Sequence, residues 1–120
     1  MLTLSELIEQ AEPLFEQAEQ AIDQDNSRAI ILYHQAIMKL DSAFSGDEII
    51  PDLKINGKYF LDLYRNINVS ASNFFNKTGN YSAYERFLGD AIKSFSQGAS
   101  KFGEAIINPC LNRLIICSFN

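Results

Sequence analysis

Apolar residues recur every three or four positions along four stretches of the chain, which is the period of a helix with one buried face. The first stretch has apolar residues at Leu4, Leu7, Ile8, Ala11, Phe15, Ala18 and Ile22. The pattern predicts helices over residues 4–24, 27–44, 53–77 and 83–107, followed by a short C-terminal segment. Because no pair of strand-like segments flanks a hairpin turn, we predict an all-α fold. It is a single helical bundle of about four helices that forms one domain over residues 1–120.

Proline and glycine residues predict where these helices bend or end. Pro13 lies inside the first stretch, so we expect a kink or a new helix start there. Thr78-Gly79-Asn80 is the clearest turn signal and separates the third stretch from the fourth. Pro109 is expected to end the fourth helix. The second stretch is apolar over most of its circumference, which predicts that it is the central helix.

The composition fits one well-packed domain. The chain has 120 residues, and 47% of them are hydrophobic, which is enough for a substantial core. No apolar run approaches the ~18 residues that cross a membrane, and the first residues lack the basic and apolar pattern of a secretory signal. Cys110 and Cys117 are expected to be free thiols. We therefore expect a cytoplasmic protein without a membrane span.

Residues that usually carry catalysis or bind metals are scarce. His34 is the only histidine, and Ile31 stands three residues before it, so the Glu-x-x-His pair of a di-iron bundle is missing. The HExxH zinc motif, the Cys/His clusters and the G-x-S-x-G nucleophile elbow are absent as well. We therefore predict no catalytic, metal-binding or cofactor-binding residues and expect that the chain is not an enzyme.

Charge is distributed unevenly along the chain. Residues 1–25 carry seven acidic side chains and no lysine or arginine, whereas the remaining residues carry ten basic and eight acidic side chains. The net charge of −5 argues against nucleic-acid binding, because phosphate contact needs a basic surface. On the first helix most acids fall off the apolar stripe, where they form either a solvated face or an electrostatic guide for a basic partner. The candidate partner contacts among them are Glu9, Glu12, Glu16 and Glu19.

In the second stretch, small residues flank an aromatic one and a leucine follows one turn later. These residues are Ala29, Tyr33, Ala36 and Leu40. Residues 27–40 resemble the second helix of MIT (microtubule-interacting and trafficking) domains, which are three-helix modules. Residues 13–25 and 58–65 are similar to their first and third helices. The resemblance covers about residues 13–70.

The resemblance implies a domain that takes an amphipathic peptide into a groove beside its second and third helices. The groove residues would be Ala29, Tyr33, Ala36, Leu40, Phe60, Leu63 and Tyr64. The fourth predicted helix has no counterpart in that family and could itself fill the groove. A tetratricopeptide array is a related option, because Gly98, Phe102 and Ala105 repeat the spacing of Ala29, Tyr33 and Ala36.

These observations favour a non-catalytic protein–protein interaction module of the adaptor type. Its partner would be a peptide or a helix, basic or amphipathic, from another protein. Two alternatives stay open: a small helical inhibitor or immunity-type protein that neutralises one enzyme or toxin, and a structural subunit that self-associates. An enzyme without recognisable residues is the least favoured class.

Overall fold

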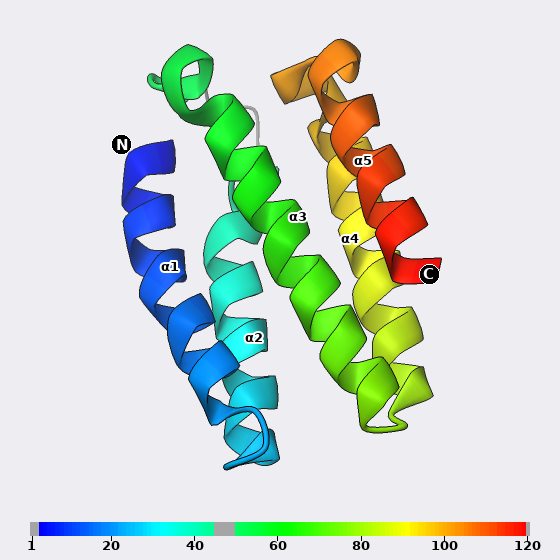
Figure 1. Ribbon diagram of the computed structural model, residues 1–120. Coiled ribbons are helices and arrows are strands. Elements are labelled where there is room, and N and C mark those ends of the chain that lie inside the picture. The colour runs from blue at the N-terminus through cyan, green and yellow to red at the C-terminus, as the bar shows by residue number, and fades with distance from the viewer. Residues whose placement is uncertain (1–2, 45–49, 120) are drawn as a thin grey trace.

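The computed structural model describes residues 3–44 and 50–119, and helices account for most of them. The helices are α1 (Leu4–Ala21), α2 (Asn26–Asp41), α3 (Leu53–Lys77), α4 (Tyr81–Phe102) and α5 (Glu104–Phe119). No strand occurs in the two described ranges. The predicted all-α bundle is therefore confirmed, and the first four helices begin within two residues of their predicted starts (Figure 1). The expected C-terminal segment is itself part of a fifth helix.

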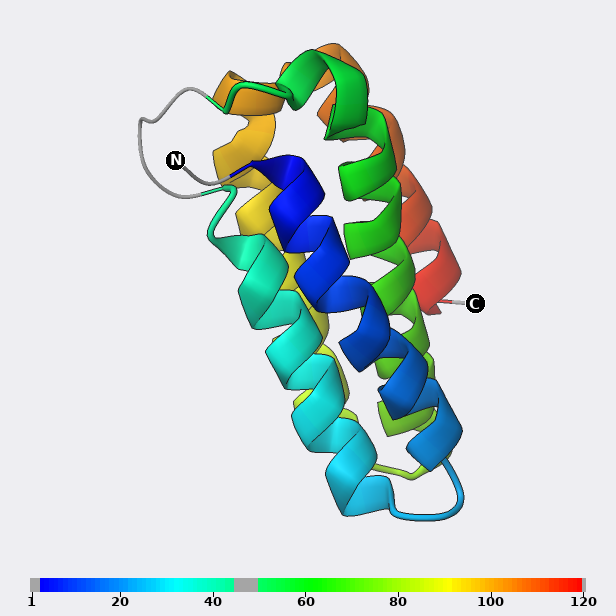
Figure 2. The same ribbon diagram turned by 90° about the vertical axis from the view of Figure 1, so that its left-hand side faces the viewer.

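The bundle is assembled around α3, which packs against each of the other four helices. It lies between the pair α1–α2 on one side and the pair α4–α5 on the other (Figure 1). Figure 2 shows α1 and α2 running side by side in opposite directions. The expectation that the second helix is central is wrong. The central helix is α3, which has 25 residues. One of its flanks is buried against α1 and α2, and another is buried against α4 and α5.

Two side chains hold the start of α1. The hydroxyl of Thr3 accepts a hydrogen bond from the backbone N–H of Glu6 at 3.1 Å. The carboxylate of Asp52, at the start of α3, accepts the backbone N–H groups of Leu4 and Ser5, both at 2.9 Å. Burial acts to raise the pKa of Asp52, but these hydrogen bonds, together with one from the side chain of Asn56, outweigh it and hold the pKa below its usual value. The first turn of α1 is therefore fixed to the first turn of α3.

Pro13 does not interrupt α1, which is continuous from Leu4 to Ala21, so the expected new helix start is wrong. A proline at this position removes the N–H group that would bond to the carbonyl of Glu9. Both residues are exposed, so water can satisfy that carbonyl.

α4 ends at Phe102, several residues before the proline expected to end it. Gly103 has a φ of +91°, a left-handed conformation that favours glycine, and α5 begins immediately after it. Pro109 lies inside α5 at an exposed position. The expectation that Pro109 ends the fourth helix is therefore wrong. The predicted turn at Gly79 is confirmed, with a φ of +78°.

Aromatic rings fill the core where α2, α3 and α4 meet. Phe44 follows α2, and its ring centroid lies 4.8 to 5.8 Å from those of four other rings. These rings belong to Phe60, Tyr64, Phe95 and Phe102. Phe44, three residues past the end of α2, thus contacts rings of both α3 and α4.

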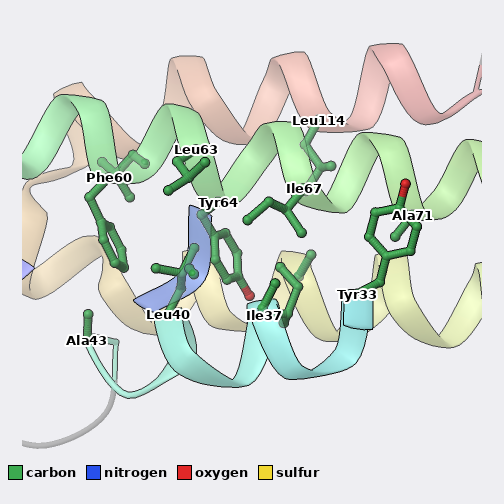
Figure 3. Close-up of a cluster of buried hydrophobic side chains, with 14 of the residues drawn as sticks. Tyr33, Ile37, Leu40, Ala43, Phe60, Leu63, Tyr64, Ile67, Ala71 and Leu114 are labelled. Carbon is green, nitrogen blue, oxygen red and sulfur yellow. The ribbon is translucent and has the colours of Figure 1, made fainter. Parts of the chain in front are cut away.

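A half-buried polar network joins α2, α3 and α4. In Figure 3, Tyr64 of α3 points toward Leu40 and Ile37 of α2. Its hydroxyl donates a 2.7 Å hydrogen bond to Oδ1 of Asp41, which also accepts the hydroxyl of Ser94 from α4 at 3.3 Å. Burial raises the pKa of Asp41, although both hydrogen bonds act to lower it. Two hydroxyl donors therefore hold this half-buried carboxylate between the helices.

Candidate functional site

The seven apolar residues predicted to line a groove lie in the core. They are Ala29, Tyr33, Ala36, Leu40, Phe60, Leu63 and Tyr64, and none is more than 8% exposed. Their side chains pack against the protein's own helices. In this structure they are therefore core residues and are not accessible to a partner.

α4 covers the side of the bundle where α2 and α3 meet. The ring of Phe87 packs against the rings of His34 in α2 and Phe75 in α3. The ring centroids are 5.2 Å and 5.6 Å apart, respectively. Further along α4, Nζ of Lys101 donates to the carbonyl of Ala43 at 3.1 Å. The groove expected beside the second and third helices is thus occupied by α4.

The four acidic residues predicted to meet a partner follow the outer side of α1. We call Glu9, Glu12, Glu16 and Glu19 the acidic row; three are exposed and Glu12 is half-buried. Glu12 accepts a 2.9 Å hydrogen bond from the hydroxyl of Tyr59, and Glu19 accepts one of 3.2 Å from Tyr33. Within residues 3–44 and 50–119, no lysine or arginine lies within salt-bridge distance of the row. Its negative charge is therefore not neutralised by the described side chains.

Beside the acidic row lies a face of α3 that the sequence did not reveal as a surface. Ile55, Lys58, Tyr59 and Asp62 have the spacing i, i+3, i+4 and i+7, so they share one side of the helix. Ile55 is 83% exposed and Tyr59 is 53% exposed. Their signal in the sequence is that both are large and apolar yet fall off the buried stripe of their helix.

α5 extends this apolar surface. Ile106 is 48% exposed and borders a cavity of about 330 Å³, which Lys58 and Asp62 line from α3. We call Ile55, Tyr59 and Ile106 the apolar strip. The acidic row belongs to α1 and the strip to α3 and α5, and the side of the bundle that these three helices form faces the viewer in Figure 1.

The seam between α1 and α3 runs along the same side. The two helices are parallel, from the cap by Asp52 at one end to an ion pair between Asp23 and Lys77, at 3.5 Å, at the other. Near the second end the seam widens into a cavity of about 260 Å³. Its lining residues are Glu19, Ile22, Ser70, Asn73, Phe74 and Lys77. The seam is thus a shallow, partly polar surface next to the acidic row.

The cavity beside Ile106 contains a thiol that is poorly suited to chemistry. Cys110 is a free, buried cysteine whose Sγ lies 3.8 Å from Oδ1 of Asp62. Burial raises the pKa of the Cys110 thiol, and the charge of Asp62 raises it further. The thiol is therefore protonated near neutral pH and is a weak nucleophile.

A second cavity of about 330 Å³ lies between α2 and the start of α4. It is lined by His34, Asn80, Ser82, Ala83, Arg86, Phe87 and Asp90. Burial lowers the pKa of His34 and Arg86 lowers it further, whereas Asp90 opposes the shift. In the part of the chain that the structure describes, no hydrogen bond joins His34 to Ser82 or Asp90. The three groups therefore do not form the connected chain that activates a nucleophile.

Among the described residues, no group of three or more His, Cys, Asp or Glu side chains is placed to hold a metal ion. None of the described helices combines the length and the apolar character needed to cross a membrane. No family model, curated protein or solved structure matches the chain. Fold and surface together define a five-helix bundle that carries the acidic row next to the apolar strip.

Proposed function

We propose that this protein is a non-catalytic interaction module of the adaptor type that binds a peptide or helix of a basic partner protein. One observation carries the proposal: among the described residues, the acidic row has no lysine or arginine within salt-bridge distance. Its members are three or four positions apart, so neighbouring carboxylates repel one another and the row opposes folding. A cationic partner would relieve that repulsion on binding.

The electrostatics support a protein partner in preference to a nucleic acid. The net charge of −5 repels phosphate groups, whereas it attracts lysine and arginine side chains and speeds their encounter with α1. Exposed charges are screened within about 8 Å at physiological ionic strength, so binding should weaken as salt is added. The free thiol of Cys110 fits the reducing conditions of the cytoplasm, where we place this activity.

A displayed library of random peptides, selected on the folded protein at low salt, tests the proposal. We expect enrichment of sequences rich in lysine and arginine, whose binding weakens as salt is raised. A double variant, Glu9→Gln with Glu16→Gln, should lose most of this binding, because both carboxylates are exposed and belong to the row.

The matched control is Glu85→Gln with Glu104→Gln, which removes the same charge at two exposed positions on α4 and α5. It should bind the selected peptides as the unmodified protein does. Equal losses from both double variants would contradict the proposal, because only net charge would then matter. Failure to enrich basic sequences would contradict it as well.

A further inference from the structure

Each of α3, α4 and α5 packs against helices that precede it in the chain. α3 packs on α1 and α2, α4 packs on α3 and reaches α2 through Phe87 and His34, and α5 packs on α3 and α4. The side formed by α1, α3 and α5 is different. In Figure 1 no described helix lies in front of α3 between α1 and α5. This is where the apolar strip is exposed.

The apolar strip offers anchor side chains that need little reorganisation. Ile55 is 83% exposed, so a partner could remove most of its apolar surface from water, which favours binding. The ring of Tyr59 is held by the hydrogen bond from its hydroxyl to Glu12. An aromatic side chain that is already oriented loses little entropy on binding, which is typical of an interface hot spot.

The charges on the two edges of the strip have opposite signs. The acidic row lies along the α1 edge. Lys58 and Arg113 line the cavity on the α5 edge, and the one carboxylate in that lining, Asp62, forms an ion pair with Arg65 at 3.8 Å. A partner that covers the strip therefore meets negative charge on one edge and a weak excess of positive charge on the other.

We propose that this side of the bundle docks one amphipathic helix of a partner protein. The apolar face of that helix covers the apolar strip, its basic residues lie along the edge that faces α1, and its other edge carries none. The inference rests on the proposed function and adds the surface and the kind of segment. Complementarity of charge on both edges fixes the direction in which the partner helix lies.

A synthetic helical peptide as long as α1 is the probe. It carries leucine on one face, lysine along one edge of that face and glutamate along the other. A control peptide of the same composition has lysine and glutamate mixed on both edges. Amide chemical shifts of the labelled protein should change along α1, along the outer face of α3 and near Ile106, and the control peptide should bind at least about tenfold more weakly.

Two double variants separate the strip from the rest of the surface. Ile55→Ser with Tyr59→Ser should weaken binding of the first peptide by about tenfold or more, because both anchors are lost. Ile31→Ser with Met38→Ser removes two side chains of α2 that are 57% and 70% exposed, and it should change the binding of the first peptide by less than about twofold. Circular dichroism checks that both variants fold.

The two proposals fail in different ways. If the peptide binds but both double variants bind it equally well, or if the shifts lie on α2 and α4, the docking surface is wrong and the proposed function stands. If neither this peptide nor any library sequence shows binding that depends on Glu9 and Glu16, the proposed function is wrong and the docking surface is wrong with it.

Discussion

Two core tyrosines donate hydrogen bonds to carboxylates, but their surroundings differ. Tyr64 donates to Asp41, which is largely shielded from solvent, whereas Tyr33 donates to Glu19, which is exposed. Water can replace a lost donor only at the exposed carboxylate. Because a buried acceptor left without its partner costs its full desolvation free energy, the two hydroxyl groups contribute unequally to stability.

Tyr64→Phe should lower the free energy of unfolding by about 1–3 kcal/mol, since it removes the shorter of the two bonds to the Asp41 carboxylate. Tyr33→Phe is the matched control and should cost less than about 1 kcal/mol, because water can replace its hydroxyl at Glu19. Urea unfolding followed by circular dichroism measures both. A larger loss from Tyr33→Phe would show that the Asp41 network does not have the role assigned to it.

His34 should make the stability depend on pH. The folded state holds its pKa below the unfolded value of 6.5, so folding favours the neutral ring. The contribution of neutral His34 to the free energy of unfolding is fully present above the pKa of the unfolded state. It is lost as the pH falls from there through the lower pKa of the folded state. His34→Phe keeps a ring against Phe87 and should show a smaller loss of stability between about pH 7.5 and about pH 5. Parallel pH curves for the two proteins would rule out this role.

At the scale of elements, the sequence predicted helix starts better than helix ends. The first four helices begin within two residues of their predicted starts, whereas α1, α2 and α4 end three to five residues before their predicted ends. The break at Gly103 was missed, because a left-handed glycine depends on where the chain must turn next. α5 was expected only as a short segment, because residues 111–117 are apolar on most sides and show no clear stripe.

The candidate site could be predicted only in part. The acidic row follows from the sequence, because its members share one side of α1 that lies next to the apolar stripe and not within it. The groove residues of α2 and α3 were expected at the surface, and they are buried because helices of the same chain pack over them. An apolar stripe on the fourth helix does not say which side of the bundle it fills. For the same reason the exposure of Ile55 and Tyr59 required the structure.

Two glycines of α4 should respond in opposite ways to the same substitution. A Cβ at Gly98 would run into the ring of Phe44, whereas a Cβ at Gly89 meets nothing within 4 Å. Alanine is favoured over glycine in a helix by about 1 kcal/mol, so Gly89→Ala should stabilise the protein by about that amount. Gly98→Ala should destabilise it by about 1–3 kcal/mol, because the core is overpacked. Thermal unfolding compares the two, and stabilisation by Gly98→Ala would contradict the close approach of α4 to Phe44.

At the scale of the whole molecule, α3 ties the two helix pairs into one unit. It packs against α1 and α2 on one flank and against α4 and α5 on the other. Without α3, each of these two pairs would expose its apolar core residues to water. Phe44 and the Asp41 network add links across α2, α3 and α4. We therefore expect the five helices to unfold in one transition.

Leu114→Ala tests whether α5 belongs to this unit. Leu114 is fully buried, so the variant should lose about 2–5 kcal/mol while tyrosine fluorescence and helical circular dichroism keep a common midpoint. Ile106→Ala removes a half-exposed side chain from the same helix and should cost less than about 1 kcal/mol. Two separate midpoints for Leu114→Ala would show that α5 melts independently.

The contact between Asp52 and the start of α1 bears on how the chain folds as it leaves the ribosome. Leu4 and Ser5 emerge before Asp52, because the carboxylate that accepts their N–H groups is made 48 residues after Leu4. Most of the stability of a helix in a protein comes from tertiary packing, and α1 also lacks this cap until the start of α3 has emerged. While only α1 and α2 have been synthesised, the first turn of α1 therefore lacks its acceptor for two backbone N–H groups. Translation of Asp52 supplies that acceptor.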